Sequence, residues 1–72
     1  MKVKIKTIKE LLKLLKNDNE IFVEDFFGIY YKQINNKIYE FDKEDDGATY
    51  YIINKYLFII KFLIKRNFYY FK

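Results

Sequence analysis

The chain has 72 residues, of which 51% are hydrophobic and 22% aromatic, and its formal net charge is +4. A chain of this size forms a single domain, residues 1–72, and this much apolar surface excludes intrinsic disorder. Cys, His, Ser, Pro and Trp are absent, which excludes disulfides, thiolate or imidazole metal sites, a Ser or Cys nucleophile and a histidine base.

The first predicted elements are a short edge strand over residues 2–6 and a helix over residues 8–16. Thr7 and Glu10 have the spacing of a capping box at the start of this helix. The apolar side chains that follow recur at helical spacing: Ile8, Leu11, Leu12 and Leu15. Residues 17–19 are poor helix formers and suit a turn that ends the helix.

From residue 20 the apolar period changes to two, which predicts strands over residues 20–24, 29–34 and 37–42. Asn35 and Asn36 suit a two-residue hairpin turn, because asparagine tolerates positive φ.

The register of this hairpin places four side chains on one face: Tyr30, Ile34, Tyr39 and Phe41. We expect this aromatic cluster to pack against the first helix, since a buried face needs large apolar side chains.

Residues 48–53 predict a further strand, and Asn54 can cap a second helix over residues 55–66. Nearly the whole circumference of this helix is apolar, so we expect the protein to self-associate as a homo-oligomer through it. A long strand is the alternative for the same segment, because Ile, Phe and Tyr favour sheets. Residues 67–72 then close the sheet as a last strand.

This order of elements predicts an α+β fold, an antiparallel β-meander of four to five strands with two helices packed on one side. The longest nearly apolar stretch, residues 56–64, is too short for a membrane helix, which needs about 20 apolar residues. We therefore expect no membrane partner and a cytoplasmic location in the host cell.

The charges are segregated along the chain: the net charge is +5 over residues 1–16, −6 over residues 17–48 and +5 over residues 49–72. Two interpretations stay open. The oppositely charged segments attract one another within the fold, or they form a bipolar surface that docks onto a charged partner. AT-rich codons encode Lys, Asn, Ile, Phe and Tyr, so a codon bias would raise the basic and aromatic content without selection for a site. Only the arrangement of charge therefore carries a functional argument.

Catalytic and metal-binding motifs are missing. The acidic loop begins like a calcium loop at Asp42, but Ile53 occupies the twelfth position, where a bidentate Glu is required. Gly28 and Gly47 belong to no phosphate-binding glycine motif. We expect a protein that is not an enzyme and that uses no metal or cofactor.

The run from Glu10 to Ile21, followed by Phe26, Gly28 and Tyr30-Tyr31, resembles small phage anti-defence proteins. Within these it is similar to the phage anti-Thoeris family, which sequesters nucleotide signals. The resemblance implies a small phage-type protein that acts by binding and not by turnover.

The leading functional hypothesis is stoichiometric inhibition of a bacterial defence protein, such as a CRISPR effector, through an acidic edge that imitates phosphate. The residues of this acidic edge are Glu24, Asp25, Glu44, Asp45 and Asp46. A candidate groove or interface consists of Phe26, Gly28, Tyr30, Tyr31, Phe58 and Phe62.

Two alternatives belong to other classes. One is a nucleic-acid-binding accessory protein that uses the helix lysines Lys9, Lys13, Lys16, Lys61 and Lys65. The other is a sponge for a nucleotide signal, built at a dimer interface.

Overall fold

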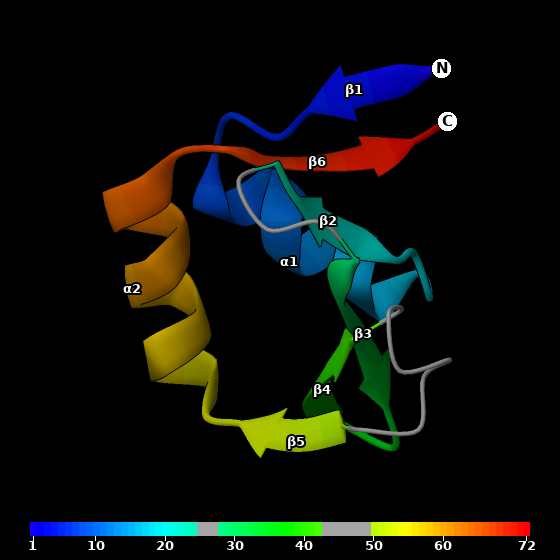
Figure 1. The fold of residues 1–72 in the computed structure, drawn as a ribbon, viewed down its shortest axis with the longest axis vertical. Coiled ribbons are helices and arrows are strands. Elements are labelled where there is room, and N and C mark those ends of the chain that lie inside the picture. Colours follow the sequence, from blue (N-terminus) through cyan, green and yellow to red (C-terminus); the bar gives the residue numbers. More distant parts are fainter. Residues whose placement is uncertain (25–27, 43–49) are drawn as a thin grey trace.

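The computed structural model describes residues 1–24, 28–42 and 50–72, which form an α+β fold of the predicted class. Figure 1 shows an antiparallel sheet of six strands that curves around the core, with two helices on its inner side. In chain order the elements are β1 (Lys2–Lys4), α1 (Ile8–Lys16), β2 (Ile21–Val23), β3 (Ile29–Ile34), β4 (Lys37–Asp42), β5 (Tyr50–Ile53), α2 (Lys55–Lys65) and β6 (Phe68–Phe71).

The start of α1 is a capping box, as its sequence predicts. The Thr7 Oγ1 accepts a hydrogen bond from the backbone N–H of Glu10 at 3.1 Å. The Glu10 carboxylate in turn accepts from the backbone N–H of Lys6 at 3.1 Å, one residue before the expected N–H of Thr7. The first contact satisfies an N–H group that the first turn of a helix leaves without an intrahelical partner, and the second ties the residue before the cap to the helix.

The hairpin of β3 and β4 has the predicted bounds and turn. Ile34 pairs with Lys37, so the turn consists of the two asparagines alone. Asn35 and Asn36 have φ values of 51° and 65°, the left-handed conformation that a two-residue hairpin turn of this type requires at both positions.

The last helix, α2, is confirmed over the alternative of a long strand. The Asn54 Oδ1 accepts from the backbone N–H of Tyr56 at 2.8 Å and caps its start. Arg66 ends the helix in the left-handed conformation, with φ of 56°, and its N–H donates to the carbonyl of Phe62.

The order of strands in the sheet is β1-β6-β2-β3-β4-β5, which differs from the predicted meander. Only β2 to β5 follow the chain order, because β6 lies between β1 and β2 and pairs with both. The physical reason is the core: Phe68, the first residue of β6, is fully buried there. A place at the outer edge of the sheet would leave this ring against solvent.

The core lies between the sheet and both helices. Its buried residues are Ile5, Leu11, Leu15, Ile21, Val23, Tyr31, Ile38, Phe58, Phe62 and Phe68. The Phe68 ring lies at its centre, with centroid distances of 5.8 Å to Tyr31, 5.6 Å to Phe58 and 5.5 Å to Phe62. These contacts join β6 to β3 and to α2.

The four side chains expected to share one face of the hairpin do share it: Tyr30, Ile34, Tyr39 and Phe41. The expectation that they pack against the first helix is wrong, because Tyr31 and Ile38, on the opposite face, are the hairpin residues in the core. Lys32 and Lys37 stand on the same face as the tyrosines. Burial of that face would desolvate two ammonium groups, so it is the face left to solvent.

Candidate functional site

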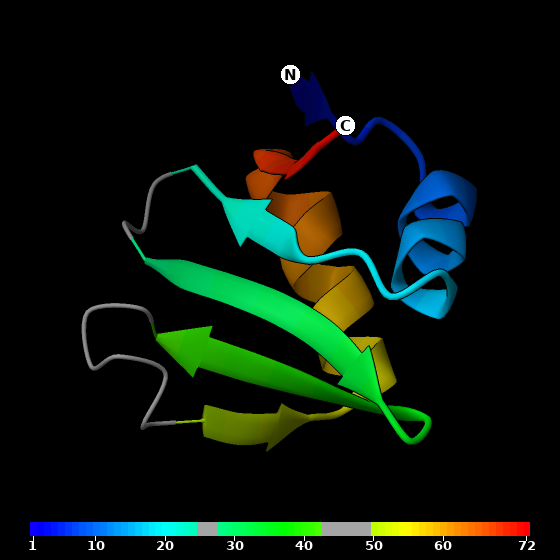
Figure 2. The same cartoon turned by 90° about the vertical axis from the view of Figure 1, so that its right-hand side faces the viewer.

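The face of the sheet that points away from the helices carries a row of aromatic rings. Successive side chains of a strand point to opposite faces, so the neighbours of the core residues point outward here. Figure 2 views the sheet from this side, with α2 behind the strands. The rings come from β6, β2, β3, β4 and β5, and we call them the aromatic row: Phe71, Tyr69, Phe22, Tyr30, Phe41, Tyr39 and Tyr50.

Each ring of the aromatic row contacts the next. The rings of Tyr30 and Phe41 stack with centroids 5.0 Å apart and planes 13° apart. Phe22 stacks on Tyr69 at 5.6 Å, and Tyr39 meets Tyr50 edge to face at 5.7 Å. Contacts of this kind contribute about 0.5–1.5 kcal/mol beyond burial and hold the rings in fixed orientations. None of the seven rings is fully buried, so the row presents aromatic surface to solvent.

Four lysines stand on the same face as the aromatic row. Residues directly opposite in an antiparallel pair share a face, and these pairs are Lys2 with Phe71, Lys4 with Tyr69, Lys32 with Tyr39 and Lys37 with Ile34. The Lys2 Nζ lies 4.3 Å from the centroid of the Tyr69 ring, a cation–π contact.

Acidic groups also lie near this face, at the ends of β2. The Glu24 carboxylate pairs with Lys2 at 2.6 Å, and this hydrogen bond lowers the pKa of Glu24 and raises the pKa of Lys2. At the other end, burial raises the pKa of Tyr30, and the charge of Glu20 adds to the effect. The positive charge on the face is therefore concentrated at Lys4 of the edge strand β1 and at Lys32 and Lys37 of the β3–β4 hairpin.

Four residues of the predicted acidic edge lie outside the described residues: Asp25, Glu44, Asp45 and Asp46. The fifth, Glu24, is exposed and bound to Lys2. The hypothesis of an acidic edge, and with it the inhibition of a bacterial defence protein, stays a prediction.

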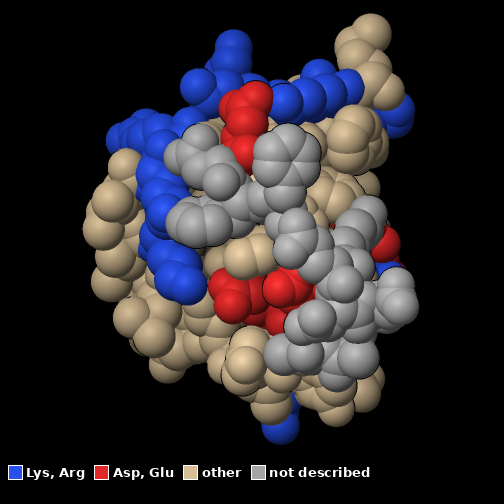
Figure 3. Space-filling view, viewed as in Figure 1, with Lys and Arg blue, Asp and Glu red and all other residues tan. Residues whose placement is uncertain are grey.

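The two ion pairs among the described residues join segments of opposite net charge. Lys2 of the N-terminal segment pairs with Glu24, and Lys61 of the C-terminal segment pairs with Glu40. Figure 3 shows Lys and Arg along the upper margin and beside α2, with one acidic group among the upper basic side chains and others to the right of the basic column beside α2. This arrangement favours the interpretation that the charged segments attract one another within the fold.

The candidate groove does not come together as one surface. Phe26 lies outside the described residues, and Gly28, with φ of 85°, leads into β3. Tyr30 belongs to the aromatic row, whereas Tyr31 is buried on the other face. The Phe58 and Phe62 side chains are also buried, at 0% and 1% exposure, so the expectation that they form an interface is wrong. They are the two buried residues of α2.

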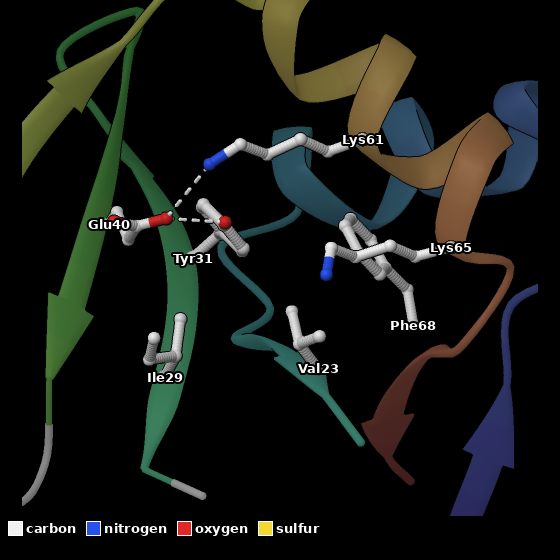
Figure 4. Close-up of a pocket in the computed structure, with 7 residues that line it drawn as sticks. All are labelled: Val23, Ile29, Tyr31, Glu40, Lys61, Lys65 and Phe68. Carbon is white, nitrogen blue, oxygen red and sulfur yellow. Dashed lines mark hydrogen bonds and ion pairs between the residues drawn. The ribbon is translucent and has the colours of Figure 1, made fainter. Parts of the chain in front are cut away.

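A cavity of about 290 Å³ lies on the helix side of the sheet, between α2 and the strands (Figure 4). The residues that line it are Val23, Ile29, Tyr31, Glu40, Lys61, Lys65 and Phe68. The Glu40 carboxylate accepts a hydrogen bond from the Tyr31 hydroxyl at 2.5 Å and lies 3.5 Å from the Lys61 Nζ. Burial, and then the hydrogen bond to Glu40, raise the pKa of Tyr31 far above its ordinary value.

The polar groups of this cavity serve the fold, because Glu40 ties Tyr31 of β3 to Lys61 of α2. Sequence reasoning missed this cluster, since no local pattern relates a residue of β4 to one in the middle of α2. Within residues 1–24, 28–42 and 50–72, no group of three or more acidic side chains could hold a metal ion.

The helix lysines of the nucleic-acid hypothesis lie on the other side of the sheet from the aromatic row. Lys61 and Lys65 line the cavity, and α1 carries Lys9, Lys13 and Lys16. The lysines that stand beside the rings are those of the strands, which sequence reasoning did not select.

No family model matches this chain, and comparison with curated proteins and with solved structures finds no match either. The resemblance to the phage anti-Thoeris family therefore stays a prediction. In the described part of the chain, neither helix has the length and apolar character to cross a membrane.

Proposed function

We propose that this protein binds single-stranded nucleic acid on the aromatic row and acts by binding, not by turnover. The observation that carries the proposal is the combination of a sheet face that neither α1 nor α2 covers, seven contacting aromatic rings and four lysines on that same face. From the sequence alone, nucleic-acid binding is an alternative that uses the helix lysines. We keep that function here but assign it to the strand residues of the aromatic row.

Stacking supplies the first part of the binding energy. An exposed aromatic ring offers a flat surface to an unstacked base, worth about 1–3 kcal/mol per base and tolerant of sequence. The aromatic row crosses five adjacent strands, and four inter-strand gaps of about 4.8 Å give it a length of about 19 Å. Bases of a duplex are already stacked, so we expect a strong preference for single strands.

Phosphate contacts supply the second part. Lys4 of β1 lies beyond one end of the row, and Lys32 of β3 and Lys37 of β4 stand beside its rings. In the proposed complex, these three ammonium groups contact the phosphates of a strand that crosses the row. Each neutralised phosphate of a single strand contributes about 0.7 to the slope of log affinity against log salt. Three such contacts predict a slope of about −2.

The test is fluorescence anisotropy with a labelled oligothymidine of about 12 nucleotides, a length within the usual site sizes. Tyr39→Leu and Tyr69→Leu each keep an apolar side chain but remove a ring from the row. We expect each to weaken binding by about 10-fold, in line with the loss of one stacked base. The matched control is Tyr51→Leu, which removes an exposed tyrosine that is not in the row and should leave affinity within about 2-fold.

A second pair of variants separates the strand lysines from the helix lysines. Lys4→Gln with Lys32→Gln should lower affinity and reduce the salt slope by about 1.4, the value for two phosphate contacts. Lys9→Gln with Lys13→Gln removes the same charge from α1 and should change neither quantity. The proposal is wrong if the wild-type chain does not bind at low salt, or if the α1 pair has the larger effect.

A further inference from the structure

The outward side of α2 is apolar, which is the reverse of an ordinary surface helix. The residues opposite its buried side are large, apolar and exposed, and we call them the outer face of α2: Tyr56, Leu57, Ile60, Leu63 and Ile64. Tyr56 and Ile64, near its two ends, are 78% and 75% exposed. A helix that is apolar on its solvent side normally packs against another element.

From this face we infer that the protein forms a symmetric dimer in which the outer face of α2 packs against the same face of a second copy. The inference is independent of the proposed nucleic-acid site, which lies on the other side of the sheet. The sequence already predicts self-association through residues 55–66. The inference assigns the contact to the five residues of the outer face and not to Phe58 and Phe62, which are buried.

The area of the face agrees with what a stable dimer needs. With exposures from 41% to 78%, and with about 200 Å² for a large side chain, its five residues expose on the order of 600 Å². Stable interfaces bury about 1,200–2,000 Å² in total, or about 600–1,000 Å² from each partner. The face therefore reaches the lower end of that range without help from other elements.

The chemistry of the face favours a second copy over a different partner. Its arc contains no charged residue, since Lys61 and Lys65 point to the cavity on another side of the helix. A two-fold axis brings each residue of such a face against the same face of the partner, and apolar side chains satisfy this pairing without complementary charges.

The rim of the face gives the dimer a distinctive response to salt. Lys55 at the start of α2 and Arg66 just after its end are exposed, and the helix contains no acidic residue. Like charges meet along the edges of a symmetric pair of these helices, and salt screens their repulsion. We therefore expect the dimer to become stronger with salt, whereas docking onto an acidic protein or an anionic lipid surface would become weaker.

The experiment is sedimentation velocity of the full chain without nucleic acid, from low to high micromolar concentration, in low and in high salt. The wild-type chain should sediment as a monomer–dimer equilibrium whose association constant rises with salt. Ile60→Lys and Ile64→Lys should each weaken association by at least about 10-fold, because each buries an ammonium group in the interface. The matched control is Ile34→Lys, which changes an exposed isoleucine at the hairpin. Its association constant should stay within about 2-fold of the wild-type value.

Circular dichroism melting of the same variants verifies that they fold, since both substituted residues of α2 are exposed. A wild-type chain that stays monomeric at high micromolar concentration in high salt overturns the inference. So does a monomer that binds anionic vesicles through this face, or a pair of folded lysine variants that dimerise as the wild type does. A failure of nucleic-acid binding leaves the inference untouched, because the two surfaces are separate.

Discussion

Tyr30 and Tyr31 are neighbours in β3, but their side chains lie on opposite faces of the sheet. Tyr31 is the buried one. Its ring packs in the core against Phe58 at 4.9 Å, and its hydroxyl donates to Glu40. Its neighbour Tyr30 points the other way and stacks on Phe41. Of these two adjacent tyrosines, one thus lies in the core and the other in the aromatic row.

The Tyr31 hydroxyl predicts a loss of stability at alkaline pH. Its pKa is raised in the folded state by burial and by the hydrogen bond to Glu40, so the unfolded chain releases this proton first. The stabilisation is present below the usual tyrosine pKa of about 10 and decreases as the pH rises above it. Tyr31→Phe should lower the free energy of unfolding by about 1 kcal/mol at pH 7, the value of one hydrogen bond.

Urea unfolding at pH 7 and at pH 11 measures both effects. The difference in the free energy of unfolding between the wild type and Tyr31→Phe should be smaller at pH 11. Only the wild type has the Tyr31 hydroxyl, so only the wild type loses its stabilisation as the pH rises. Tyr51→Phe, at an exposed position, should behave as the wild type at both values. An unchanged difference between pH 7 and pH 11 would show that the hydroxyl does not carry the effect.

The turn of the β3–β4 hairpin allows a direct test of the link between residue type and backbone conformation. Asn36 has φ of 65°, which costs most residues about 1–2 kcal/mol and glycine nothing. Asn36→Gly should stabilise the protein by about 0.5 kcal/mol, and Asn36→Ala should destabilise it by about 1 kcal/mol. Thermal unfolding measures both, with Asn17→Gly as the control.

Asn17 has φ of −94°, so glycine relieves no strain there and should not raise the melting temperature. Equal changes in melting temperature for Asn36→Gly and Asn17→Gly would contradict the argument from the positive φ of Asn36.

The elements that the sequence predicts well are those with local signals. The capping box of Thr7 and Glu10 begins α1, and the asparagine pair turns the hairpin, with bounds that match the structure. The position of β6 between β1 and β2 could not be predicted, because it depends on pairing with two distant strands and on the contact of Phe68 with Tyr31, far away in the chain.

The sequence predicts which residues of the hairpin share a face, but not that this face is exposed. Alternation puts Tyr30 and Tyr39 on one face of the hairpin, but it does not say which face the helices cover. A signal was present: Lys32 and Lys37 stand on that face, and a lysine at such positions favours solvent. Four of the five residues of the predicted acidic edge lie outside the described residues.

At the scale of the whole molecule, one ring joins most of the core. Phe68 contacts Tyr31, Phe58 and Phe62, and a chain of this length has about 4–11 kcal/mol of total stability. Phe68→Ala should cost about 3–5 kcal/mol and leave much of the population unfolded at 37 °C. Phe68→Leu keeps most of the volume and should cost about 1–2 kcal/mol.

Circular dichroism and urea unfolding measure the two variants. The control is Phe71→Leu in the same strand, since that ring is 56% exposed and its loss should cost less than about 1 kcal/mol. Equal losses at residues 68 and 71 would mean that the core is not organised around β6.

The ends of the chain lie side by side in β1 and β6 (Figure 1). The N-terminal amino group donates to the carbonyl of Lys72 at 3.1 Å, and the N–H of Lys72 donates to the carbonyl of Met1 at 2.9 Å. A purification tag fused to either end would leave the fold next to Lys2 and Phe71. Immobilised or tagged protein would then carry foreign residues against one end of the stacking surface, so affinity is best measured after the tag has been cleaved.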